Sequence, residues 1–166
     1  MKMDVIKEYS DEMKKNLGEL GFETAISLKN EVVIDVFSGG ETGLKAYSGK
    51  NYDFVIRKGK ADIIYGLENE GFLLNKGLCS KLKENNMFVV FSFSSLIKKE
   101  NIFSIYKNLL INGKLCNDYS INCIYSSLAE NQYELLSPFQ LESFAAEFGY
   151  NYKNMIKSCE ELKKRI

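Results

Sequence analysis

The alternation of short apolar runs with helical periodicity constrains the fold of this chain more than any other feature of its sequence. Apolar runs begin at Ala61, Met87 and Ile121, and between them apolar residues recur at the i, i+3/i+4, i+7 spacing of a helix with one buried face. Strands that alternate with helices form a parallel sheet with right-handed crossovers. The sequence from Ala61 onward therefore predicts a βαβαβαα succession.

The segment before Ala61 contains strand candidates that are too close together for helical crossovers. A βαβ connection takes at least about 10–12 residues, and fewer separate Leu28 from Val32 or Phe37 from Leu44. Either these strands pair as hairpins or one of them is not a strand. Along the whole chain the predicted strands are Met3–Ile6, Phe22–Leu28, Val32–Phe37, Leu44–Ser48, Ala61–Leu67, Met87–Phe93 and Ile121–Ser126.

The clearest helix signal lies at Ser137-Pro138-Phe139-Gln140. Ser137 can cap the first free amides, Pro138 suits the first helical position, and Gln140 can reach back to complete a capping box. We expect this helix to end at Gly149. Other helices are predicted from further apolar faces, which consist of Met13, Leu17 and Leu20 before Gly21; Leu74, Leu78 and Leu82; Ile102, Ile105, Tyr106 and Leu109; and Met155, Cys159, Leu162 and Ile166 after Asn151.

The composition indicates one folded domain and excludes several kinds of catalysis. The chain has 166 residues, of which 45% are apolar, and it contains a single proline. Because the sequence has no linker rich in Gly, Ser or Pro, we expect one domain over residues 1–166. It has no histidine, which excludes His-ligated zinc, Ser-His-Asp and Cys-His nucleophile pairs, and imidazole acid–base catalysis. Lys+Arg and Asp+Glu number 22 each, so any binding must depend on local charge.

The cysteines and the apolar runs bear on the cellular compartment. Cys79, Cys116, Cys123 and Cys159 form no CxxC pair, and we expect them to be core thiols. The N-terminus lacks the apolar run of a signal peptide, and no stretch approaches the roughly 18–20 apolar residues that span a membrane. We therefore expect a cytoplasmic protein with no membrane partner.

Glycines and carboxylates offer two weak signals of ligand binding. The segments 39–43 and 48–51 invite a phosphate-loop interpretation, but their spacing does not match a Walker loop, so tight turns are favoured. Carboxylates near strand ends could hold a hard cation such as Mg²⁺, although Asp62 opens its strand and Glu68 closes it, so these two cannot share a site. Solvated or capping roles are favoured for the whole set, which consists of Asp35, Asp62, Glu68, Glu70 and Glu130.

Small basic groups on predicted loops are the best candidates for contacting nucleic-acid phosphates. They are Arg57-Lys58 with Lys60, and Lys98-Lys99 after the strand that ends at Phe93. Because the net charge is zero, RNA binding would require the lysines to gather on one side of the molecule, away from the carboxylates. Tyr125 and Tyr133 could stack on bases or pack against protein, and packing is favoured.

Four blocks between Lys60 and Tyr150 resemble the archaeal and eukaryotic ribonuclease P protein component 3 family, a relative of the polymerase-and-histidinol-phosphatase (PHP) barrels. The blocks follow the family's order, and their family patterns are VDIL, GLNxVLCKLA, VAIGFSFSxLL and SxAxNxYExRSPxDL. In this chain they read ADIIYGLE at 61–68, LNKGLCSKL at 74–82, FVVFSFSSLI at 88–97 and SSLAENQYELLSPFQL at 126–141. The residues that carry the motifs include Asp62, Gly66, Glu68, Ser137, Pro138 and Gln140.

The resemblance implies an α/β fold, a reduced or incomplete PHP-like (TIM-like) β/α barrel of about seven short, mostly parallel strands. It implies a subunit of ribonuclease P, the ribonucleoprotein that removes the 5′ leader from precursor tRNA. The family's protein pairs with component 2 and other subunits and holds the ribonuclease P RNA in its active shape. Catalysis belongs to that RNA, with Mg²⁺ bound there, so the isolated chain is expected to hold no metal or cofactor and to be non-catalytic.

The chain departs from its relatives at positions that matter for mechanism. Where family members sometimes keep SDAH, this sequence has Ser127-Leu128-Ala129-Glu130, and the family's Arg before Ser-Pro is Leu136. The Asp that follows in the family is Gln140. Two alternatives stay open: a Mg²⁺-dependent phosphoesterase on a small β/α barrel, and a module that binds only protein.

Overall fold

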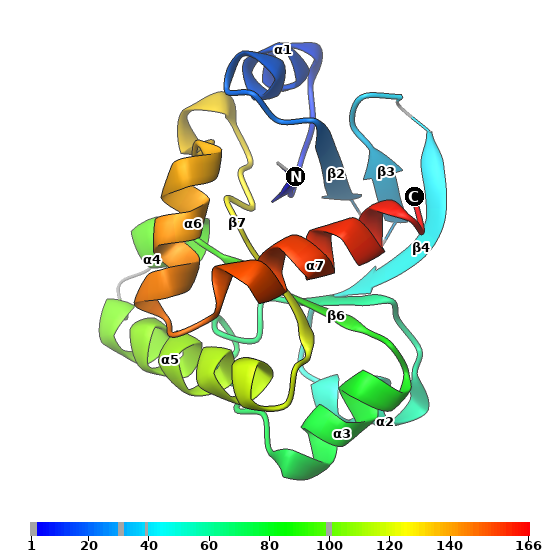
Figure 1. Ribbon diagram of the computed structural model, residues 1–166, viewed down its shortest axis with the longest axis vertical. Coiled ribbons are helices and arrows are strands. Elements are labelled where there is room, and N and C mark those ends of the chain that lie inside the picture. Colours follow the sequence, from blue (N-terminus) through cyan, green and yellow to red (C-terminus); the bar gives the residue numbers. More distant parts are fainter. Residues whose placement is uncertain (1–2, 30–31, 39, 99–100) are drawn as a thin grey trace.

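The computed structural model describes residues 3–29, 32–38, 40–98 and 101–166. Its core is a seven-stranded sheet whose strands follow one another in chain order and curl into a nearly closed barrel (Figure 1). This confirms the predicted reduced β/α barrel. The strands are β1 (Met3–Ile6), β2 (Thr24–Lys29), β3 (Val32–Asp35), β4 (Glu41–Tyr47), β5 (Ile63–Tyr65), β6 (Phe88–Ser92) and β7 (Asn122–Ser126).

The crowded first half folds as hairpins. Strand β3 runs antiparallel to both β2 and β4, while every other neighbouring pair is parallel. Strand β2 ends at Lys29 three residues before β3 begins, and β3 ends at Asp35 six residues before β4 begins. Antiparallel strands need no crossover helix, so these short spacings are sufficient. The glycine-containing segment between β3 and β4 is the turn of a hairpin, as favoured from the sequence; Gly39 itself lies outside the described residues.

The barrel closes between β1 and the segment that follows β7. The amide of Leu128 donates to the carbonyl of Val5 (3.0 Å), and the amide of Lys7 donates to the carbonyl of Ala129 (2.9 Å). The buried carboxylate of Asp4 completes this seam by accepting hydrogen bonds from the Ser127 amide (2.9 Å) and hydroxyl (2.6 Å). One polar side chain thus joins the first strand to the last.

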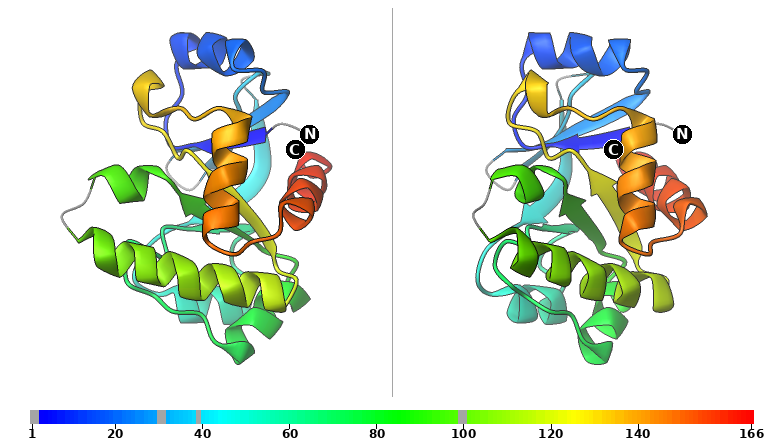
Figure 2. Two further views of the ribbon diagram at one scale, coloured as in Figure 1. Left: turned by 60° about the vertical axis from the view of Figure 1, so that its left-hand side comes forward. Right: turned by 90° about the vertical axis from the view of Figure 1, so that its left-hand side faces the viewer.

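Helices surround the barrel (Figures 1 and 2). Among them, the Ser137 capping box forms as predicted, with Ser137 and Gln140 each accepting from the other's backbone amide. Ile102, predicted to face the core, is instead exposed, because it lies on the first turn of its helix. The helices are α1 (Asp11–Glu19), α2 (Tyr52–Lys58), α3 (Lys76–Glu84), α4 (Ser94–Lys98), α5 (Ile102–Asp118), the 3-10 turn η1 (Gln132–Glu134), α6 (Pro138–Glu147) and α7 (Tyr152–Lys163).

Two helices, α2 and α4, were not predicted. The signal for α2 was present, since Tyr52, Val55 and Ile56 recur at helical spacing and are buried. Helix α4 spans only five residues, too few for periodicity to show. As a result Arg57, Lys58 and Lys98, predicted on loops, lie in the last turns of these helices, where their charge complements the helix dipole.

The main core lies between the sheet and the helices α2, α3, α5, α6 and α7, and a smaller apolar cluster lies under α1. The four cysteines are buried free thiols, as expected. Tyr125 is fully buried and its ring packs against Phe91, Phe144 and Phe148, which confirms the packing interpretation for this residue. In the described part of the chain, no helix has both the length and the apolar character needed to cross a membrane.

We expect the Tyr125→Phe variant to be at least as stable as the wild type. The buried Tyr125 hydroxyl has no hydrogen-bond partner among the residues that the structure describes, so removing it sacrifices no bond and can gain about 1 kcal/mol in free energy of unfolding. Tyr150→Phe is the matched control, because the Tyr150 hydroxyl donates to the Ile121 carbonyl (2.8 Å). That variant should lose about 1–3 kcal/mol in urea denaturation. An equal loss in both would contradict the assignment.

Candidate functional site

The mouth of the barrel, at the carboxyl ends of the strands, holds a cavity of about 430 Å³. In β/α barrels this end carries the functional loops, because each strand delivers its following loop there. The loops after β1, β4, β5, β6 and β7 all contribute to the walls. The lining residues are Lys7, Ser48, Tyr65, Gly66, Asn69, Glu70, Ser94, Ser95, Lys98, Leu128 and Glu130.

Two lysines and two glutamates form an ion-pair chain along one side of this mouth. Glu130 binds both Lys7 (2.6 Å) and Lys98 (2.9 Å), and Lys98 also binds Glu134 (2.7 Å). The hydrogen bonds from Lys7 and Lys98 lower the pKa of Glu130 to about 2. Burial alone would lower the pKa of Lys98, but its bonds to Glu134 and Glu130 outweigh burial and raise it. The charge of Lys98 is therefore already neutralised within the protein.

A network of polar side chains forms the floor of the mouth. The buried carboxylate of Glu68 accepts from the Ser92 amide (3.2 Å) and the Ser95 hydroxyl (3.0 Å). The side-chain NH₂ of Asn69 donates to the Ser95 hydroxyl oxygen (2.8 Å), and the Ser94 hydroxyl donates to the Leu128 carbonyl (3.2 Å). These bonds attach the loop after β5 to the start of α4, so Glu68 acts here as a structural acceptor.

Asp4 is the second buried carboxylate near this end. Burial raises its pKa to about 6, although the hydrogen bonds from Ser127 and Val5 oppose that shift. Its place at the seam between β1 and β7 makes it part of the framework that shapes the mouth. Sequence reasoning missed Asp4, yet a signal was available, since it is a charged residue inside the apolar run Met3–Ile6.

The basic residues predicted from the sequence do not gather at one place. Lys98 follows β6 at the mouth, whereas Arg57, Lys58 and Lys60 precede β5 and therefore lie at the opposite end of the barrel. All three of these are exposed; Arg57 pairs with Asp53 (2.9 Å), and the Lys60 ammonium lies over the Phe54 ring, 4.6 Å from its centroid. In the described part of the chain Lys58 forms no ion pair. Lys99 lies outside the described residues.

Tyr133 and the motif residues Gly66 and Asp62 lie in different parts of the molecule. The packing interpretation is wrong for Tyr133, which is 89% exposed on the short η1 turn and lines a second hollow of about 300 Å³ that adjoins the mouth at Glu130. Gly66, at the mouth, has a φ of +78°, and a Cβ there would approach the Ser48 hydroxyl to 2.7 Å, so only glycine fits. Asp62 lies at the other end, where it accepts from the Lys45 amide (2.9 Å).

The carboxylates considered for Mg²⁺ are likewise dispersed. Glu68, Glu70 and Glu130 are near the mouth, Asp62 is at the opposite end, and Asp35 accepts from the Phe37 amide within a turn. Within residues 3–29, 32–38, 40–98 and 101–166, no three Asp, Glu or Cys side chains are grouped so that they could hold a metal ion. Glu130 instead bonds to lysines, Asp35 and Asp62 accept from backbone amides, and Glu68 accepts from an amide and a hydroxyl.

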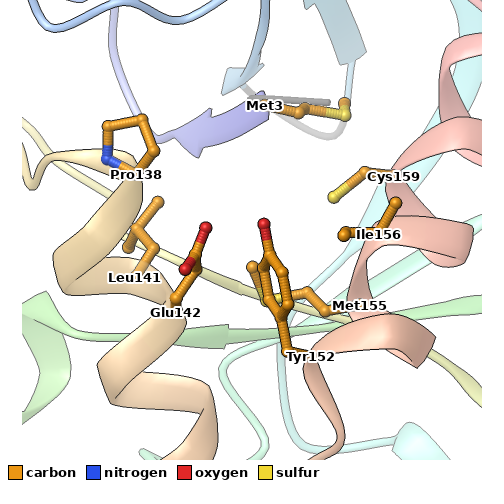
Figure 3. A pocket seen from close by; sticks show the side chains of 8 residues that line it. All are labelled: Met3, Pro138, Leu141, Glu142, Tyr152, Met155, Ile156 and Cys159. Carbon is orange, nitrogen blue, oxygen red and sulfur yellow. The ribbon is translucent and has the colours of Figure 1, made fainter.

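A further hollow lies between α6, α7 and β1 (Figure 3). It encloses about 20 Å³, room for little more than one water molecule. Glu142 and Tyr152 lie side by side and both point into it, and the hydrogen bond with Glu142 raises the pKa of the Tyr152 hydroxyl. This hollow is a packing feature of the junction between α6 and α7 and is too small for a ligand.

Comparison with known proteins gives one informative result. No family model matches the sequence, and no curated protein matches it with significance. The structure, however, is similar to a chain in a solved structure described as the cryo-EM structure of archaeal ribonuclease P with mature tRNA. The TM-score is 0.70 at 14% identity, and the match covers 99% of this chain and 91% of that chain. The two chains therefore share a fold over almost their whole length.

Proposed function

We propose that this chain is a protein subunit of ribonuclease P that pairs with component 2 and helps to hold the catalytic RNA in its active shape. The observation that carries the proposal is the shared fold over 99% of this chain with a chain of an archaeal ribonuclease P. The four sequence blocks between Lys60 and Tyr150 point to the same complex independently of the fold.

The bonding at the mouth supports a structural role for that end of the barrel. Lys7 and Lys98 are bound to Glu130 and Glu134, and the hydroxyls of Ser94 and Ser95 are bound to a carbonyl and to Glu68. Side chains whose charges and hydrogen bonds are satisfied by one another hold the loops of this end in place. The contribution of this chain to tRNA maturation is then shape and local positive charge, while the attacking water is activated by Mg²⁺ in the RNA.

Phosphate contacts are proposed for the opposite end of the barrel. Lys58 and Lys60 are exposed there, and their ammonium groups are engaged by no carboxylate that the structure describes. We do not propose a phosphate contact for Lys98, because its charge is already balanced by Glu130 and Glu134. An exposed, unbalanced lysine attracts a phosphate and releases counterions when it binds.

Reconstitution tests the proposal directly. Ribonuclease P RNA with component 2 is assayed for cleavage of precursor tRNA across a Mg²⁺ titration, with and without this chain. We expect the chain to lower the Mg²⁺ concentration needed for half-maximal cleavage by about 2-fold or more, because neutralised phosphates reduce the need for divalent ions. Binding to component 2 with an unchanged Mg²⁺ requirement would favour the protein-only module. Phosphoester hydrolysis by the isolated chain, lost in Glu68→Ala, would favour the enzyme alternative.

The Lys58→Glu/Lys60→Glu double variant tests the phosphate contacts. We expect it to weaken binding to the RNA by about 10-fold or more and to reduce the slope of log K against log[salt] by about 2, because each lost phosphate contact contributes about 0.9. Lys153→Glu/Lys157→Glu on α7 is the matched control, since both of its lysines are exposed and the change in net charge is the same. Equal weakening in the two double variants would indicate bulk charge and not a contact at Lys58 and Lys60.

A further inference from the structure

Helix α5 carries a buried apolar face and, beside it, a second apolar stripe that is partly exposed. Its inner face includes the buried Ile105 and Leu109. Beside that face Phe103, Tyr106 and Leu110 recur at i, i+3 and i+7, the spacing of a second stripe along the helix, in which the Tyr106 ring packs partly against the core. Phe103 is 92% exposed and Leu110 is 38% exposed. A helix that only covered a barrel would place polar residues on this side.

Two adjoining hollows follow the second stripe. One, of about 400 Å³, is lined by Tyr106 of α5, by Phe93 and Leu96 next to it, and by the side of α6. The other, of about 560 Å³, includes Leu110 and continues toward the end of α5. Both are lined by Glu147 and Phe148, where the C-terminal end of α6 meets α5 (Figure 2). Together they form a mainly apolar groove along α5, which we call the α5 groove.

We propose that the α5 groove binds an amphipathic helix of the protein subunit with which this chain pairs. The inference rests on the proposed function, and it adds the surface and the form of the contact. The α5 residues that line the two hollows run from Tyr106 to Asp118, a length of about 18 Å, or a little over three helical turns. A partner helix with apolar residues at i, i+3/i+4 and i+7 would bury both hollows, in the manner of helix-in-groove recognition.

The charges around the groove favour protein over RNA. Lys114 and Asp118, of opposite charge, both line the second hollow, and Glu147 adds a negative charge that both hollows share. Glu147 accepts a hydrogen bond from the Tyr106 hydroxyl (2.6 Å), which places a carboxylate in the middle of the groove. A phosphate backbone would meet repulsion there, whereas an apolar helix with a basic flanking residue would find a complementary surface.

The exposed apolar area is of the size that a protein contact requires. A phenylalanine side chain presents about 150–250 Å², so Phe103, Leu110 and the neighbouring Ile102 together expose roughly 300 Å² of apolar surface before the walls of the hollows are counted. Apolar patches of roughly 300–600 Å² on a monomer are often functional. A standard interface buries about 800 Å² on each partner, a little over half of it apolar.

Binding of purified component 2 to the full chain tests the groove. We expect Leu110→Glu, within the groove, to weaken binding by about 30-fold or more in calorimetry, since a charge buried in an interface is costly. Phe103→Glu, on the stripe next to the groove, should weaken binding by about 10-fold. Leu20→Glu is the control: Leu20 is 38% exposed, as Leu110 is, and lies at the end of α1, outside the groove, so this variant should bind as the wild type does. Unchanged thermal melting confirms that each variant folds.

The outcomes separate this inference from the proposed function. If the wild type binds component 2 and both groove variants bind equally well, the groove inference is overturned while the ribonuclease P role stands. If the wild type restores cleavage at low Mg²⁺ without binding component 2, the groove inference fails in the same way. If the groove variants instead abolish self-association or RNA binding, a second copy or RNA occupies the groove and the inference is wrong. If the wild type neither binds nor restores cleavage, both proposals fail.

Discussion

Replacing Gly113 with alanine is expected to lower the free energy of unfolding by about 3 kcal/mol, because the added methyl group has no room. Gly113 is buried in the middle of α5. A Cβ at this position would lie 2.3 Å from the Tyr125 hydroxyl and 2.8 Å from the Phe148 carbonyl oxygen. The second contact is with backbone, so relief would require α5 and the end of α6 to move apart. Urea denaturation followed by circular dichroism measures the loss.

Gly18→Ala is the matched control for this prediction. Gly18 also lies within a helix, α1, but a Cβ there would have no heavy atom within 4 Å. Alanine is the better helix former, so this variant should gain about 0.5–1 kcal/mol. Combining Gly113→Ala with Tyr125→Phe should recover part of the loss, because one of the two close contacts disappears. Stability of Gly113→Ala equal to that of the wild type would contradict the packing between α5 and β7.

Removing the Asp4 carboxylate is the second large effect that we expect. Asp4→Ala leaves the buried amide and hydroxyl of Ser127 without their acceptor, at a cost of about 3 kcal/mol or more in free energy of unfolding. Asp4→Asn should retain most of the stability, because its amide oxygen can accept from the Ser127 amide and its NH₂ can donate to the Ser127 hydroxyl. Equal losses in the two variants would show that the carboxylate charge itself holds the seam.

Protonation of Asp4 determines whether the stability of the chain rises or falls with pH. Its pKa is about 6 in the folded chain and 3.8 in the unfolded reference, so the folded state binds the proton more tightly. The contribution of Asp4 to the free energy of unfolding is largest below about pH 4, and it decreases by about 3 kcal/mol in total as the pH rises to about 6. Asp4→Asn should remove this fall. A urea midpoint series from pH 4 to 8 measures it, and an identical decline in wild type and Asp4→Asn would refute the assignment.

Glu130 changes the stability in the opposite direction from Asp4 and over a lower pH range. Its pKa is lowered from 4.5 to about 2, so the stability that it contributes is present above about pH 4.5 and is lost as the pH falls toward 2. The side chain is partly exposed, so its contribution is smaller than that of Asp4. The two carboxylates are thus distinguishable by the pH range in which each variant departs from the wild type.

The candidate site shows where sequence reasoning reached its limit. Lys98 was selected because it follows a strand and has a basic neighbour, and both features are local. Its neutralisation depends on Glu130 and Glu134, which arrive from the loop after β7. The expected gathering of the basic groups on one side is wrong for a related reason, since Lys98 follows its strand whereas Arg57 and Lys60 precede theirs, at opposite ends of the barrel.

The sequence by itself determined where the strands lie and which helix carries a capping box. It also limited the first half to two arrangements, in which the close strands pair as hairpins or one of them is not a strand. These features depend on periodicity, cap chemistry and connection length, all of which act over a few neighbouring residues. Only the tertiary structure decided which lysines keep a free charge, that Asp4 closes the barrel with Ser127 and that α5 presents a second apolar face beside the end of α6. Each of these depends on residues far apart in the chain, whose meeting is set by the closure of the barrel and not by local spacing.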